Sequence, residues 1–174
     1  MFIGHLPAGY LLAHFLYKTL KLENIPKRTI LSVSLVGSVL PDFDLFYFYL
    51  IDNKQHSHHT YWSHMPMFWL VLYLISMLTS RIWKSARLLP LSTVLVFSVL
   101  LHLFLDSIVG SIYWLYPLSD ITLTLVEVFP KYNWWVLNFI LHWTFALEVV
   151  VLTLAVLLHI KSRRHLITEK LPNN

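Results

Sequence analysis

Long apolar segments, separated by short polar and basic stretches, dominate the pattern of this chain. Five segments stand out, over residues 2–20, 29–51, 65–79, 88–116 and 134–160. A membrane-spanning helix needs roughly 20 residues, so the last two are long enough and the first and third are short. The second contains the sequence PDFD, and Pro41 favours a break there because proline donates no backbone hydrogen bond. We therefore predict an all-α membrane helical bundle of about five segments, one of them broken at Pro41.

The composition supports an integral membrane protein. Of the 174 residues, 57% are hydrophobic and 13% are charged, and that charged share is about half of the value typical of soluble proteins. The length fits one membrane domain over residues 1–160, followed by a polar tail over 161–174. The chain has no cysteine, which excludes disulfides and thiolate metal sites.

The positions of the basic residues predict an orientation. Eleven of the thirteen lysines and arginines follow the first, third and fifth segments, and would lie on one side if all five segments spanned. The positive-inside rule assigns this side to the cytoplasm, so the N-terminus is expected outside and the C-terminal tail inside. Because the net charge of +4 is distributed in this way, we read it as a topology signal and expect no nucleic-acid partner.

Seven ionisable side chains lie in or beside the apolar segments. An ionisable group inside a bilayer costs at least ~2.5–3.5 kcal/mol, so such a set indicates a functional site. Imidazoles and carboxylates are also common ligands of divalent metals. The predicted topology places all seven toward the outer side. They are His5, Asp42, Asp44, His59, His64, His102 and Asp106.

The carboxylates allow a metal site or a purely structural role. His102 and Asp106 share one helix face, where they could ligate a metal or, equally well, form a polar pair between helices. Asp42 and Asp44 could converge if the chain breaks at Pro41. Alternatively, Asp42 could cap the helix that restarts after the break.

The histidines outside the fourth segment give weaker signals. His59 and His64 belong to a tract of four histidines within nine residues, a composition typical of metal binding. The alternative is a solvated loop, which we expect for His56 and His58. His5 stands alone near the N-terminus, where a structural role is the favoured interpretation.

These residues resemble, in four ordered elements, the membrane-bound metal-dependent hydrolase family, which comprises small inner-membrane hydrolases described as LexA-regulated. The likeness covers about residues 3–118. It departs from the family pattern after the first histidine of the third element, where Thr60 and Tyr61 replace the family's Arg and Gly, and Met65 replaces a Ser. The four elements are Gly4-His5, Pro41-Asp42-Phe43-Asp44, His59 with His64, and His102 with Asp106 followed by Gly110 and Tyr116-Pro117.

The resemblance implies a metal-dependent hydrolase in the bacterial inner membrane, in contact with the lipid bilayer. All seven residues are candidate metal ligands, with Asp44, Asp106 and His64 as candidate catalytic groups. Their chemistry suits Zn²⁺, or else Mn²⁺ or Fe²⁺, and their number suits one or two ions. The predicted outer location favours an ester or phosphoester of a lipid-like substrate, such as a lipid-linked phosphate. The alternative is a non-enzymatic carrier or sensor of divalent metal, or a proton-handling protein.

Overall fold

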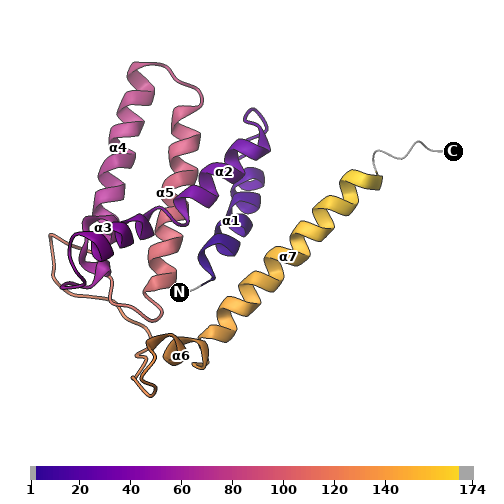
Figure 1. Ribbon diagram of the computed structural model, residues 1–174. Helices are drawn as coiled ribbons and strands as arrows, with labels where there is room; N and C mark the ends of the chain where they lie inside the picture. Colours follow the sequence, from indigo (N-terminus) through magenta and orange to yellow (C-terminus); the bar gives the residue numbers. More distant parts are fainter. Residues whose placement is uncertain (1–2, 169–174) are drawn as a thin grey trace.

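The protein is a bundle of helices in the computed structural model, which describes residues 3–168 (Figure 1). Within this range an isolated bridge between Ile112 and Leu123 is the one pairing of β type, so the all-α prediction is confirmed. The α-helices are α1 (His5–Thr19), α2 (Lys27–Gly37), α3 (Asp44–Leu50), α4 (Pro66–Ile82), α5 (Leu88–Asp106), α6 (Trp135–Ile140) and α7 (Phe145–Thr168). Three single-turn 3-10 helices are η1 (Pro41–Phe43), η2 (His58–Thr60) and η3 (Trp62–His64).

Fewer helices could cross a membrane than the sequence predicts. In the described residues, α5 and the Phe145–Arg164 part of α7 are long and apolar enough, and α2 with Pro41–Leu50 adds a third only as one bent span. The expected number of about five membrane segments is therefore not supported. The reason is helix length. With 15 residues in α1 and 17 in α4, these helices rise by about 22 and 26 Å, against a hydrocarbon core of about 30 Å.

The central helix is α5, which packs against α1, α2 and α4. Leu16, Ile30 and Val94 form the core where α1, α2 and α5 meet. Trp69 and Leu103 belong to a second core cluster, between α4 and α5. The last long helix, α7, lies at the edge of the bundle and packs against α1 (Figure 1).

Small residues let three of these helices approach closely, as is common between membrane helices. A Cβ at Gly9 of α1 would lie 2.7 Å from the Cβ of Ser38, and a Cβ at Gly37 would lie 2.9 Å from the Cβ of Ser98. The hydroxyl of Ser34 donates to the carbonyl of Gly9 at 2.8 Å and lies 2.8 Å from the hydroxyl of Ser98. The backbones of α1, α2 and α5 are therefore held in direct contact about one helical turn from the predicted site residues Asp42 and His102.

The chain bends after α2, as predicted from Pro41. The axes on either side differ by 51°, and Asp42 and Phe43 donate to carbonyls three residues back, those of Val39 and Leu40. Leu40 itself keeps helical angles, with φ −59° and ψ −39°. The bend thus follows from the missing N–H of Pro41 and not from an extended residue before it. Neither η1 nor α3 has a side-chain capping bond, so the alternative role of Asp42 as a helix cap is not found.

The start of α7 is tied to the start of α1. The buried Glu148 carboxylate accepts the backbone N–H groups of Ile3 at 2.5 Å and of Gly4 at 3.0 Å. Further along, the Tyr10 hydroxyl lies 3.2 Å from the Nδ1 of His159. The two helices therefore run side by side in the same direction. Residues 161–168 continue α7, so the first part of the expected tail is helical, and residues 169–174 lie outside the described range.

Candidate metal centre

The structure brings all seven predicted site residues to one end of the bundle. This end is opposite the basic loops, which with their flanking residues cover 18–28 and 81–87 (Figure 1), so the separation of basic and site residues expected from the sequence exists in the fold. Each site residue lies in a single-turn 3-10 helix or in the first or last turns of an α-helix. His5 begins α1, Asp42 lies in η1, Asp44 begins α3, His59 lies in η2, His64 ends η3, and His102 and Asp106 lie in the last turns of α5.

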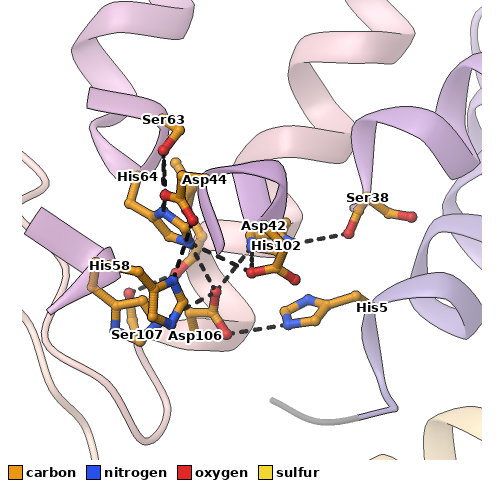
Figure 2. Close-up of polar contacts among 12 residues, drawn as sticks. His5, Ser38, Asp42, Asp44, His58, Ser63, His64, His102, Asp106 and Ser107 are labelled. Atoms are coloured by element: carbon orange, nitrogen blue, oxygen red, sulfur yellow. Dashed lines mark hydrogen bonds and ion pairs between the residues drawn. The ribbon is translucent and has the colours of Figure 1, made fainter. Parts of the chain in front are cut away.

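Four of the seven form a compact group, consisting of Asp42, His64, His102 and Asp106, whose ligand atoms all lie within 4.8 Å of one another (Figure 2). The Nε2 of His102 lies 3.0 Å from Asp106 Oδ2 and 3.6 Å from Asp42 Oδ1. The Nε2 of His64 lies 3.7 and 3.8 Å from the same two oxygens. Four ligands around a tetrahedral ion with bonds of about 2.0–2.1 Å lie about 3.3–3.4 Å apart. The spacing of the compact group therefore fits one such ion.

The hydrogen bonds of the two histidines aim their other nitrogens at this point. The Nδ1 of His102 donates to the carbonyl of Ser38 at 2.8 Å, and the Nδ1 of His64 donates to Asp44 Oδ2 at 2.7 Å. A neutral imidazole held in this way presents a lone pair at Nε2. Both Nε2 atoms are buried and have no hydrogen-bond partner among the described residues. Because they face carboxylate oxygens, which also carry lone pairs, the arrangement needs a cation at its centre, either a metal ion or protons on the rings.

Asp44 lies behind His64 and not in the compact group. Its carboxylate accepts the Nδ1–H of His64 and the hydroxyl of Ser63. Its other oxygen lies 3.5 Å from the Nδ1 of His58. Carboxylates in such positions commonly orient a histidine ligand and fix its tautomer. Of the two aspartates in the PDFD element, the structure thus places Asp42 at the centre and Asp44 in the layer that supports it.

His5 and His59 border the compact group on either side of Asp106. The Nε2 of His5 lies 3.1 Å from Asp106 Oδ1, and its ring stacks on His102 with centroids 3.9 Å apart. The Nε2 of His59 lies 4.0 Å from Asp106 Oδ2. Gly110 makes room for the His59 ring, because a Cβ there would lie 2.7 Å from its Nδ1. Burial lowers the pKa of His59 to about 3, so this imidazole is neutral at pH 7 and able to act as a ligand.

His58 was not among the predicted site residues. It was expected in a solvated loop with His56, but only His56 fits that description, since it pairs with Asp52 and is largely exposed. His58 joins His59 and His64 in a second group of potential ligands, again within 4.8 Å of one another. The histidine-rich composition was the one signal for it, because no periodic spacing applies in an irregular loop.

Two cavities adjoin these residues on different sides, and each has a volume typical of a small-ligand site. The first, of about 650 Å³, reaches the carboxylates of the compact group, and we call it the Lys54 cavity. It is lined by Asp42, Leu45, Phe48, Tyr49, Lys54, His58, His59, Asp106, Val109 and Phe139. The second, of about 640 Å³, reaches Asp44, and we call it the Asp44 cavity. It is lined by Leu40, Phe43, Asp44, Tyr47, Asp52, His56, Tyr61, Trp62, Ser63 and Trp69.

Apolar helices of membrane-spanning length, with a buried His/Asp cluster at one end of the bundle, define a helical membrane protein with a candidate metal centre. Comparison with family models narrows this class. The model described as YdjM inner membrane protein matches residues 1–167, so the chain belongs to the YdjM inner membrane protein family. That match confirms the expected inner-membrane location, while its description names no reaction or metal. Searches of curated proteins and of solved structures found no match.

Proposed function

We propose that the protein is a membrane-embedded, metal-dependent hydrolase that acts on an ester or phosphoester of a lipid-like substrate. One observation carries the proposal. Two buried histidines, each held through Nδ1, direct their Nε2 atoms toward the same two carboxylate oxygens at 3.0–3.8 Å, the spacing of metal ligands.

The compact group would hold the ion, and its mixed nitrogen and oxygen donors suit Zn²⁺, with Mn²⁺ or Fe²⁺ as alternatives. A divalent ion bound there would supply the Lewis acidity that metal-dependent ester hydrolysis uses. The group of His58, His59 and His64 could hold a second ion beside it. The two groups share His64, whose Nδ1 is bonded to Asp44, so its Nε2 can bind only one of two neighbouring ions and the other would keep His58 and His59 as its ligands.

The remaining predicted residues receive roles from their contacts. Asp44 is a positioning residue because His64 and Ser63 both donate to it, which leaves it less suited to act as the general base. Asp106 contacts His5 and His102 through different oxygens and lines the Lys54 cavity. We therefore assign Asp106 and His64 to the reacting centre, and His5 to the support of Asp106.

The cavity and its surroundings favour an amphiphilic substrate. The lining of the Lys54 cavity combines the apolar side chains Leu45, Phe48 and Phe139 with carboxylates and histidines. A molecule with a hydrocarbon part and a polar ester head would match both. The site lies at the end of the bundle away from the basic loops, and we propose that it faces the outer side of the inner membrane.

Hydrolysis is tested with purified protein in detergent, using short-chain phosphoesters and carboxylic esters in the presence of Zn²⁺ or Mn²⁺. Activity should disappear with a chelator and in the Asp106→Ala variant, and His142→Ala, whose ring bonds locally to Thr144, serves as the control. Bound metal without turnover of either ester class would instead favour the carrier or sensor alternative.

The orientation has a separate test, because the chain has no cysteine. Single variants Gln55→Cys and Ala86→Cys label the two ends of the bundle. A membrane-impermeant maleimide applied to intact cells should label the first and not the second. The reverse pattern would place the site on the cytoplasmic side.

A further inference from the structure

The two cavities beside the candidate centre differ in charge. The Asp44 cavity carries two carboxylates, Asp44 and Asp52, and no lysine or arginine. The Lys54 cavity carries one permanent cation, Lys54, and its two carboxylates belong to the compact group, where a bound cation would offset their charge. With a cation bound to the compact group, the Lys54 cavity would therefore accommodate an anionic group, which the two carboxylates of the Asp44 cavity would repel.

Local structure directs Lys54 toward this cavity. After α3 the chain reverses through Asn53 and Lys54, whose φ values of 49° and 64° are left-handed. The backbone N–H of Lys54 donates to the carbonyl of Phe48 at 3.1 Å. Its ammonium group lies 4.8 Å from the centroid of the Tyr49 ring, an attractive cation–π distance. Phe48 and Tyr49, both in α3, line the same cavity. The turn therefore places the Lys54 ammonium group beside the part of the cavity lining that α3 provides.

We infer that the Lys54 cavity binds an anionic phosphoester head group and that Lys54 determines this specificity by contacting a phosphate oxygen. The inference rests on the proposed hydrolase function and selects phosphoesters within it. A phosphoester carries a negative charge that a nearby ammonium group stabilises. A carboxylic ester is neutral and gains little from the same lysine. The apolar residues of the cavity accept the hydrocarbon part of the substrate in both cases.

The test compares Lys54→Met, which removes the charge, with Lys54→Arg, which keeps it. Lys131→Met is the matched control, because Lys131 also lies in a loop over a tyrosine ring, at 5.6 Å from the Tyr132 centroid, and lines neither cavity. Binding of inorganic phosphate to the metal-loaded protein is measured by calorimetry. The KM and kcat of an alkyl phosphoester and of a neutral carboxylic ester follow, together with metal content.

Lys54→Met should weaken phosphate binding and raise the KM of the phosphoester by about ten- to hundred-fold, the usual effect of losing a charged hydrogen bond. Metal content should stay at the wild-type value, and the KM of the carboxylic ester should change far less than that of the phosphoester. Lys54→Arg should retain phosphate binding, and Lys131→Met should match the wild type in every quantity. Equal phosphate affinity in Lys54→Met and wild type would overturn the inference while leaving the hydrolase proposal intact. If the wild type shows no metal-dependent turnover, the hydrolase proposal itself is refuted. The comparison of phosphate affinity between wild type and Lys54→Met would still test the role of Lys54.

Discussion

A methyl group at Gly37 would test how closely α2 must approach α5 for the site to form. In Gly37→Ala the new Cβ would lie 2.9 Å from the backbone carbonyl oxygen of Leu95 and 2.9 Å from the Cβ of Ser98. Ordinary contact begins near 3.4 Å. Neither neighbour is the end of a flexible side chain, so α2 must move away from α5 by about half an ångström.

The cost follows from this overpacking. Extra carbon in a well-packed contact destabilises a fold by about 1–3 kcal/mol. For a chain of this size, each kcal/mol lowers the Tm by roughly 2–4 °C, which gives an expected decrease of about 2–12 °C. The shift should also reach the site, because Asp42 lies in η1, the first helical turn after α2, and His102 lies one turn beyond Ser98 on α5. It would widen the 3.6 Å distance between Asp42 Oδ1 and His102 Nε2 and weaken metal binding.

The assay is thermal unfolding in detergent, with and without Zn²⁺, followed by metal titration of the same sample. Val36→Ala is the control, because Val36 is adjacent in sequence but 51% exposed. Gly37→Ala should show a lower Tm than this control and a smaller increase on adding Zn²⁺. If the two variants match in Tm and in metal affinity, the close packing of α2 on α5 does not set the site geometry.

Two further predictions concern single side chains near the site. Asp44→Ala should lower metal affinity about 10- to 100-fold without abolishing binding, because it frees the His64 ring without removing a ligand, and unchanged affinity by calorimetry would contradict the positioning role. Hydrogen bonds from the His56 side chain and backbone lower the pKa of Asp52 from 3.8 to about 2. The contact therefore stabilises the loop fully above about pH 4, and this stabilisation is lost as the pH falls toward 2. Pepsin should cleave that loop more slowly in the wild type than in Asp52→Asn at pH 4, with the difference vanishing near pH 2; equal rates at pH 4 would exclude the contact.

The sequence predicted the features that depend on local chemistry. Pro41 produced the expected bend because a missing N–H acts wherever it occurs. His102 and Asp106 lie on one face because a regular helix imposes that spacing. The number of membrane segments was overestimated, because α1 has 15 residues where its apolar run has 19, and α4, with 17, is also below the roughly 20 residues that a span needs.

Features that depend on tertiary packing were beyond reach. The partner of the His102 Nδ1 is the backbone carbonyl of Ser38. Every residue has such a carbonyl, so the sequence cannot indicate which one accepts the bond. His58 begins the single-turn helix η2, which the sequence did not predict, and only the folded chain separates its position from that of the exposed His56. The different positions of Asp42 and Asp44 likewise follow from the path of η1 into α3.

The central claim is that the compact group binds a divalent metal ion, and the metal content of the purified protein tests it most directly. Protein loaded with Zn²⁺, passed through a desalting column and analysed by mass spectrometry, should retain at least one ion per chain in the wild type and in the control His142→Ala. His102→Ala and Asp106→Ala should retain far less, while remaining folded by circular dichroism. Near-zero metal in the wild type, or equal metal in all four proteins, would contradict the claim and leave the cluster as a set of structural contacts between helices.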